Sequence, residues 1–420
     1  MKILFVHQNF PAQFLHLAPA LARAGHDVVA LTMRPQAQTL VLWQGVKVLA
    51  YRAGRGTSAD THPWAKDLET KVIRGEACLR AAQSLDQQGW KPDAIVAHPG
   101  WGESLFLKDL WPQARLGLYL EFFYRAQQQD VGFDAEFTPS SPLEISSVLR
   151  MRNAVSLLHL EAMDAALSPT HWQASTYPQT FRERTTVAHD GINTTRLCAN
   201  PAASFPVNDQ LRLRAGDEVI TFVNRNLEPY RGYHIFMRAL PEILRRRPHA
   251  HVLIVGGDGV SYGVAPDPER EGYSTWKETF AEPARAQMTA QEWSRVHFLG
   301  NVPYDVYIAI LQVSAVHVYW TYPFVLSWSL LEAMSAGCTI VASDTAPVRE
   351  VITHGETGYL TDFFDVDEMV RRVCEVLQSA QDGRPEKTGQ AAREVIRSRY
   401  DLETRCLPDQ MAWVTEKLLS

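Results

Sequence analysis

Two arginines lie where they could neutralise a bound diphosphate. Arg225 follows an apolar segment of strand type at 219–223, and Arg231 precedes a helical segment that begins near Tyr233. Parallel sheets bind ligands beyond the carboxyl ends of their strands, where helix N-termini also favour phosphate. Two planar guanidinium groups suit that charge. Because loop arginines are often only solvated, their spacing alone leaves both interpretations open.

A second candidate is a serine-bounded loop that could seat a nucleotide. It lies between an apolar strand at 315–319 and a short helix that carries Glu332 and ends at Gly337. Glu332 could contact a ribose diol. However, Ser329 and Glu332 also have the spacing of a capping box, in which both side chains bond the first turn of their own helix.

Glycines after the strand at 251–255 form the run Gly-Gly-Asp-Gly, which includes Gly257. A glycine has no Cβ, so the backbone there can approach a ligand closely. An ordinary tight turn explains the run equally well.

In the first half of the chain, polar side chains end two apolar strands. His98 follows a strand at 94–97, and Glu121 follows one at 116–120. Glu121 could accept a proton from a hydroxyl or hold that hydroxyl, and His98 could orient it. Either residue could equally be a structural partner. The loop at 7–13 lacks G-x-G-x-x-G, which counts against a dehydrogenase, and its composition is that of a helix start.

The composition bounds the class of protein. A chain of 420 residues with 46% hydrophobic and 21% charged residues predicts two globular domains. The formal charge of -6 gives no broad attraction to nucleic acid or anionic lipid. Five cysteines without C-x-x-C spacing argue against a zinc cluster and a disulfide framework, and indicate a reducing compartment. No apolar run approaches the length of a membrane span.

Strand and helix patterns alternate along the whole chain, which predicts α/β domains with parallel sheets. A segment rich in Pro, Ala and Asn at 198–210 reads as the linker, so we expect domains at 1–203 and 204–399. A long, charged and aromatic stretch at 262–295 does not follow this alternation of strands and helices. It is either an insertion over a cleft or a surface elaboration.

Nearly the whole chain, and most strongly residues 224–360, resembles the family 4 retaining nucleotide-sugar glycosyltransferases, which belong to glycosyl transferases group 1. The resemblance rests on Leu-Glu-Ala-Met at 331–334, on Pro-Val-Arg-Glu at 347–350, and on Arg225 with Arg231-Gly232, which match the family's Arg and Lys-Gly. It implies a GT-B fold, with two facing Rossmann-like domains, an interdomain cleft, and a C-terminal helix at 400–420 that completes the first domain.

The resemblance also implies roles for individual residues. Arg225 and Arg231 would contact the diphosphate, Glu332 the ribose, and backbone amides of the loop the sugar and phosphate. The implied donor site comprises Arg225, Arg231, Gly257, Phe324, Val325, Leu326, Ser327 and Glu332. The catalytic candidates are Glu121, His98, Arg225 and Arg231.

Two positions depart from the family pattern. The first of the family's paired glutamates is replaced by Phe324, which offers a flat apolar wall and suggests a less polar donor sugar, such as a deoxy sugar. The family's sugar-contacting histidine in the first domain is replaced by Glu121.

We therefore predict a retaining glycosyltransferase that moves a sugar from a nucleotide-diphosphate sugar to a glycan, lipid-linked or small-molecule acceptor, in synthesis of a bacterial-type polysaccharide, glycolipid or glycoconjugate. No cofactor and no obligatory metal are expected, because arginines and helix dipoles can stabilise the departing charge. We expect no nucleic-acid partner, and a cytoplasmic location with a possible peripheral contact at the inner face of the membrane. A sugar-nucleotide-binding protein without turnover and a nucleotide-sugar epimerase are the alternatives.

Overall fold

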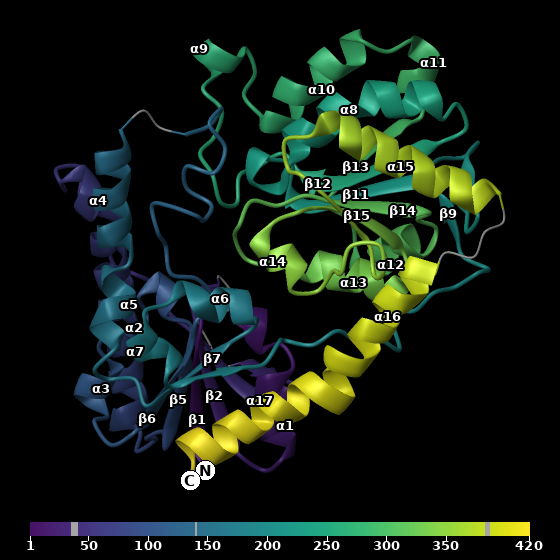
Figure 1. Cartoon of the computed structure of the whole chain (residues 1–420). Coiled ribbons are helices and arrows are strands. Elements are labelled where there is room, and N and C mark those ends of the chain that lie inside the picture. The colour runs from purple at the N-terminus through teal and green to yellow at the C-terminus, as the bar shows by residue number, and fades with distance from the viewer. Residues whose placement is uncertain (35–40, 139–140, 383–386) are drawn as a thin grey trace. The chain divides into compact units, whose positions relative to one another are not determined.

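A computed structural model describes residues 1–34, 41–138, 141–382 and 387–420, which form two compact units (Figure 1). The first unit is Met1–Gly191 together with Leu402–Ser420, and the second is Ile192–Asp401. The first unit ends earlier than the predicted boundary at residue 203. Ile192 already bridges Asp401 of the second unit, and the linker segment contributes a strand to a small hairpin there.

The first unit is built on one eight-stranded sheet in the order β3-β4-β2-β1-β5-β6-β7-β8. The strands are β1 Lys2–Val6, β2 Asp27–Thr32, β3 Val41–Trp43, β4 Val46–Ala50, β5 Ala94–Ala97, β6 Arg115–Tyr119, β7 Ala165–Ser168 and β8 Thr185–Val187. All neighbours are parallel except β3, an edge strand antiparallel to β4. The central strands are buried on both faces, which explains their continuous apolar sequences.

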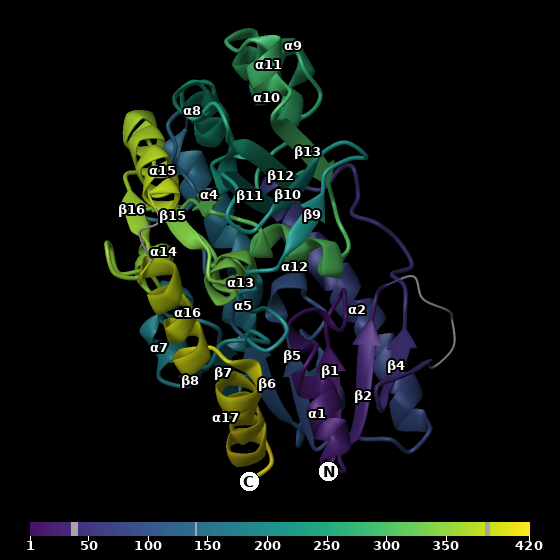
Figure 2. The ribbon, with the colours of Figure 1, turned by 90° about the vertical axis from the view of Figure 1, so that its right-hand side faces the viewer.

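Helices cover both faces of this sheet. They are α1 Leu17–Arg23, α2 Lys66–Gln87, α3 Leu107–Leu110, α4 Pro142–Arg152, α5 Ala154–His159, α6 His171–Thr176, α7 Gln179–Arg182 and α17 Leu407–Trp413. One core cluster joins β1 to α1 and the C-terminal helical segment, and another joins the opposite face to α2. Helices α1 and α17 lie side by side near the termini (Figure 2).

Gly117 in β6 shows how closely the C-terminal segment sits on this sheet. A Cβ on Gly117 would lie 2.5 Å from Leu418 Cδ1 and 2.7 Å from the Trp413 ring. A larger residue would therefore push the C-terminal helix away from the sheet.

The helical segment after residue 141 is divided into two helices, α4 and α5, with Asn153 at the break. The Asn153 side chain bonds both the N–H and the carbonyl of Tyr124. A side chain committed to a distant backbone segment is a tertiary contact that periodicity does not reveal.

The second unit has a six-stranded, fully parallel sheet in the order β13-β12-β11-β14-β15-β16. Its strands are β11 Val219–Asn226, β12 His251–Gly257, β13 Val296–Gly300, β14 Val316–Tyr319, β15 Thr339–Ser343 and β16 Tyr359–Thr361. A separate antiparallel hairpin is formed by β9 Ser204–Pro206 and β10 Arg212–Arg214. The predicted alternation and the parallel sheet are confirmed.

The helices of the second unit again form two layers. They are α8 Tyr233–Arg246, α9 Pro268–Glu271, α10 Trp276–Ala286, α11 Ala290–Trp293, α12 Tyr304–Gln312, α13 Trp328–Ala336, α14 Ala346–Arg349, α15 Val366–Gln381 and α16 Lys387–Arg399. Helices α8 and α15 lie on one face of the sheet, and α12 and α13 lie on the other (Figure 1).

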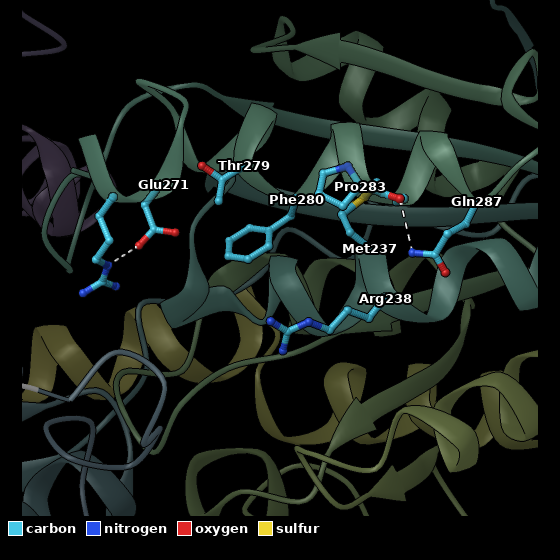
Figure 3. A pocket seen from close by; sticks show the side chains of 9 residues that line it. Met237, Arg238, Glu271, Thr279, Phe280, Pro283 and Gln287 are labelled. Carbon is cyan, nitrogen blue, oxygen red and sulfur yellow. Dashed lines mark hydrogen bonds and ion pairs between the residues drawn. The ribbon is translucent and has the colours of Figure 1, made fainter. Parts of the chain in front are cut away.

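The stretch at 262–295, which does not follow the alternation, forms α9 to α11, and α10 packs on α8. A pocket of about 320 Å³ lies between them (Figure 3). Met237 and Phe280 are among its lining residues, and the Arg238 guanidinium lies 5.8 Å from the centre of the Phe280 ring. Most of the stretch therefore elaborates the outer helix layer of the second unit.

Within the described ranges, none of the helices combines the length and the apolar character needed to cross a bilayer.

A buried carboxyl group makes the stability of the first unit depend on pH. Glu103 lies in the segment that follows strand β5 and is fully buried. Neither of its carboxyl oxygens has a hydrogen-bond partner among the described residues. Burial disfavours the charged form and raises the pKa of Glu103 to about 7. Its contribution to stability is therefore fully present below the unfolded pKa and is lost as pH rises through 7.

We expect Glu103→Gln to remove this pH dependence, because an amide does not titrate. Between pH 5 and pH 8 the wild-type unfolding free energy should fall by about 2–3 kcal/mol more than that of the variant. Thermal unfolding of both proteins at the two pH values measures the difference. Equal pH slopes would show that Glu103 is ionised in the folded protein.

Candidate functional site

The loop after β11 places a buried arginine at the carboxyl edge of the second sheet. The chain makes a single 3-10 turn at Pro229–Arg231, then Gly232 adopts a left-handed conformation with φ 64° and begins α8. A Cβ on Gly232 would lie 2.3 Å from Trp320 Cβ, so only glycine fits. This turn directs Arg231 inward, where it is 5% exposed.

Arg231 joins this loop to the loop after β14. One terminal nitrogen of its guanidinium donates to Thr321 Oγ1 at 2.8 Å, to the Val325 carbonyl at 3.2 Å and to the Tyr319 hydroxyl at 3.4 Å. The Tyr262 ring lies 4.9 Å away. These hydrogen-bonding partners are neutral. No carboxylate in the described residues lies within ion-pair distance of Arg231, and the buried Glu228 attracts the guanidinium only at longer range. A buried cation without a paired anion is costly, so this position favours an anionic ligand.

The loop at 321–327 leaves two backbone donors unused. Phe324 and Ser327 use their amides within the protein, since the Phe324 N–H donates to the Tyr322 carbonyl and the Ser327 N–H to the Tyr319 hydroxyl. In the described part of the chain, the amides of Val325 and Leu326 have no hydrogen-bond acceptor. Unpaired backbone N–H groups beside a buried cation can together bind an anion.

The cap of α13 differs from the predicted capping box. Ser327, rather than Ser329, is the N-cap, and its hydroxyl accepts the Ser329 N–H at 3.3 Å. Glu332 lies more than one turn into the helix and accepts hydrogen bonds from the hydroxyls of Tyr304 at 2.8 Å and Tyr307 at 2.9 Å. The capping box, one of the two interpretations of Ser329 and Glu332, is therefore excluded. Burial raises the pKa of Glu332, and the tyrosine donors oppose that rise.

Phe324 belongs to an aromatic cluster. Its ring centre lies 5.0 Å from that of Tyr262 and 5.8 Å from that of Tyr230, and Tyr230 stands 4.8 Å from Tyr322. Glu228 accepts the backbone N–H groups at 261–263 and so holds Tyr262 in place. The Phe324 side chain is therefore buried among rings, at the position where the family resemblance implies a carboxylate.

Arg225 and Gly257 are the other two residues predicted to bind the sugar donor. Arg225 lies near the end of β11, is exposed, and has no side-chain partner in the described residues. Gly257 ends β12, where a Cβ would lie 2.8 Å from Asn226 Oδ1 and 2.9 Å from Asn301 Nδ2. The glycine is thus explained by two neighbouring amide side chains, and its contact with a ligand stays a prediction.

In the first unit, three adjacent parallel strands bring His98 and Glu121 together. Because β1, β5 and β6 are neighbours, the residues after them share one edge of the sheet. His98 Nε2 lies 3.5 Å from Glu121 Oε2, and Gln13 Nε2 donates to Glu121 Oε1 at 3.1 Å. Gln13 was not predicted as a site residue.

Backbone hydrogen bonds fix the tautomers of two imidazoles here. His98 Nδ1 accepts the Gly100 N–H at 3.1 Å, and His7 Nδ1 accepts the Asn9 N–H at 2.9 Å. A neutral imidazole whose Nδ1 accepts must carry its proton on Nε2. Burial lowers the pKa of His7 to about 3. Both imidazoles are therefore hydrogen-bond donors rather than bases.

Glu121 is the charged acceptor among these donors. Burial alone would raise its pKa, but hydrogen bonding from His98 and Gln13 brings the pKa below its usual value. His7 Nε2 and the Trp101 indole N–H are buried without hydrogen-bond partners among the described residues. An ionised carboxylate beside unused N–H donors suits a ligand whose hydroxyls both donate and accept.

Two site residues of the first unit escaped sequence analysis. His7 and Gln13 lie in a loop whose composition predicts only a helix start. The available signal was positional: His7 directly follows β1, beside the strands that precede His98 and Glu121.

Both halves of the chain match models of known families. Residues 24–197 match the glycosyl transferase family 4 group, and residues 207–395 match glycosyl transferases group 1. These matches and the two α/β units define a glycosyltransferase of the GT-B fold. The chain belongs to the family 4 glycosyltransferases.

Individual relatives agree with this assignment. The chain is 24% identical to a glycogen synthase of Mycobacterium tuberculosis over 96% of its own length and 92% of that protein. It is 26% identical, over 51% of each chain, to a GDP-mannose-dependent alpha-(1-6)-phosphatidylinositol monomannoside mannosyltransferase of the same organism.

Solved structures share the fold at low sequence identity. Sucrose-phosphate synthase from Thermosynechococcus elongatus superposes with a TM-score of 0.73 at 16% identity, covering 100% of this chain and 99% of that one. Anabaena Alr3699/HepE in complex with UDP gives a TM-score of 0.69 at 17% identity, with 100% of both chains covered.

Proposed function

We propose that this protein is a retaining, metal-independent glycosyltransferase that moves a sugar from a nucleoside-diphosphate sugar to an acceptor hydroxyl. One observation carries the proposal: the buried Arg231 guanidinium has no carboxylate partner among the described residues and lies beside the unused amides of Val325 and Leu326. A diphosphate supplies the negative charge that these donors lack.

The second unit binds the donor. Arg231 and the exposed Arg225 hold the diphosphate, aided by the N-terminus of α13, and Glu332 accepts the ribose hydroxyls. The Anabaena relative of the same fold was crystallised with UDP and with UDP-glucose, which supports a nucleotide-sugar donor. Gly257 has no Cβ, so the backbone at this residue can come close to the nucleotide.

The first unit presents the acceptor. Glu121 accepts a hydrogen bond from an acceptor hydroxyl. The His98 Nε2–H lies 3.5 Å from Glu121 Oε2 and is shared between that carboxylate and a hydroxyl oxygen. Because both imidazoles already carry their Nε2 proton, they orient hydroxyls and do not remove protons. Glu121, with its lowered pKa, is a weak base.

The resemblance to the retaining glycosyltransferases implies the course of the reaction. The acceptor oxygen attacks the face of the sugar from which the nucleotide leaves, and the departing phosphate helps to take the proton. The two arginines and the α13 N-terminus stabilise the negative charge that develops on the diphosphate, so no metal is required for this step.

The biological setting is the synthesis of a bacterial-type polysaccharide, glycolipid or glycoconjugate in the cytoplasm. Family 4 relatives include a glycogen synthase and a phosphatidylinositol monomannoside mannosyltransferase. A lipid-linked acceptor would bring the protein to the inner face of the membrane as a peripheral protein.

The diphosphate assignment predicts the effect of removing the buried charge. With ADP, GDP, UDP and dTDP as probes, a nucleotide at about 100 times its Kd should stabilise the wild type by about 2.7 kcal/mol, seen as a rise in Tm. Arg231→Met should lose that rise, and Arg225→Met should reduce it. Arg245→Met is the matched control, because Arg245 is exposed and forms an ion pair with Glu242 on its own helix. If Arg231→Met shows the same nucleotide-dependent rise in Tm as the wild type, the diphosphate does not bind at Arg231.

The acceptor role of Glu121 is testable by charge removal. Glu121→Gln keeps the shape but loses the ionised acceptor, so kcat/KM for the acceptor should fall roughly 10- to 100-fold while nucleotide affinity stays unchanged. Release of nucleoside diphosphate with a panel of glycan, lipid-linked and small-molecule acceptors measures this effect. Retained turnover with unchanged acceptor affinity would exclude Glu121 from the mechanism.

Phe324 should influence the choice of donor sugar. An aromatic wall in place of a carboxylate gives up a polar contact to the sugar, so we expect a less polar sugar, such as a deoxyhexose, to be preferred. Phe324→Glu should shift preference towards fully hydroxylated sugars by roughly tenfold. Turnover of a panel of nucleotide sugars by the wild type and by the variant measures this preference. An unchanged order of preference would refute the role of Phe324.

A further inference from the structure

Two tyrosines of one helix converge on the carboxylate of the next. Tyr304 and Tyr307 stand one turn apart on α12, and their hydroxyls donate to Oε1 and Oε2 of Glu332 on α13, at 2.8 Å and 2.9 Å. Each carboxylate oxygen therefore receives one phenol. This arrangement fixes the plane of the carboxylate in a way that one hydrogen bond would not.

The more exposed tyrosine is itself held in place. Tyr304 is 41% exposed, yet the Arg196 guanidinium lies 4.8 Å from the centre of its ring. Arg196 is in turn paired with Asp305 at 2.6 Å. An aromatic ring with a cation over one face loses much of the freedom that an exposed side chain normally has.

The acceptor capacity of Glu332 is only half used. An ionised carboxylate has about four lone-pair sites, two on each oxygen. The two tyrosines occupy one site on each oxygen, and they are the only partners of the Glu332 side chain within the described residues. Glu332 is half-buried, so one open site remains on each oxygen for a ligand. A vicinal diol supplies two O–H donors with matching separation.

We propose that Tyr304 and Tyr307 are positioning residues that aim the two open acceptor sites of Glu332 at the 2′- and 3′-hydroxyls of the donor. The protein then selects ribonucleoside diphosphate sugars and rejects 2′-deoxyribonucleoside donors such as dTDP-linked sugars. This inference rests on the proposed function, because it requires a nucleotide at Glu332.

A structural role alone explains the geometry less well. Tyr233 in the same unit is also buried, and its hydroxyl is satisfied by the Lys277 carbonyl at 3.2 Å. A backbone carbonyl suffices to satisfy a buried phenol. Two phenols on one charged group instead orient an acceptor whose remaining sites face a ligand.

The experiment compares ribose with 2′-deoxyribose. Binding of ADP, GDP and UDP and of their 2′-deoxy forms to the full chain is measured by calorimetry for wild type, Tyr307→Phe and Tyr304→Phe. A missing hydroxyl leaves an acceptor site unpaired, so the wild type should prefer the ribonucleotide by about tenfold or more. In both variants that ratio should fall to roughly one- to threefold, mainly through weaker ribonucleotide binding.

Tyr233→Phe is the matched control and should keep the wild-type ratio, because it removes a buried phenol hydroxyl away from Glu332. Should Tyr307→Phe fold poorly, the exposed Tyr304→Phe provides the same test. The inference is overturned if the wild type binds both sugars equally, or if the variants weaken both forms by the same factor. A wild type that binds no nucleotide at all would instead defeat the proposed function.

Discussion

The second unit depends on the buried guanidinium of Arg231. Its hydrogen bonds to Thr321, Tyr319 and the Val325 carbonyl tie the β11 loop to the β14 loop. Its hydrogen-bonding partners are neutral and Glu228 attracts it only from beyond ion-pair distance, so the positive charge has no directly bound anion. A fold that carries such a charge gives up some stability and gains a site prepared for an anion.

Several local features serve this one interaction. Gly232 lets the chain turn inward at Arg231, and Glu228 collects three backbone amides to hold Tyr262 beside the guanidinium. The rings around Phe324 bury the same loop. A charge in a dry environment interacts more strongly with a ligand phosphate than the same charge at an open surface.

The first unit uses the opposite charge. Glu121 is held ionised by Gln13 and by an imidazole whose tautomer is set by the backbone of its own loop. Donors without internal acceptors surround one charged acceptor. This suits recognition of neutral hydroxyls, whereas the second unit suits a diphosphate, and the two units thus differ in the chemistry that their parallel sheets support.

The sequence by itself determined the alternation of strands and helices, the parallel sheets and the family. These follow from apolar periodicity and from motifs such as the segment around Glu332, which are local along the chain. Only the tertiary structure decided that Ser327 rather than Ser329 caps α13, that Tyr304 and Tyr307 hold Glu332, and that His7 joins His98 and Glu121. Each of these depends on which elements become neighbours. Contacts between residues far apart in sequence leave no periodic signal, so the sequence could name a charged residue but could not name its partners.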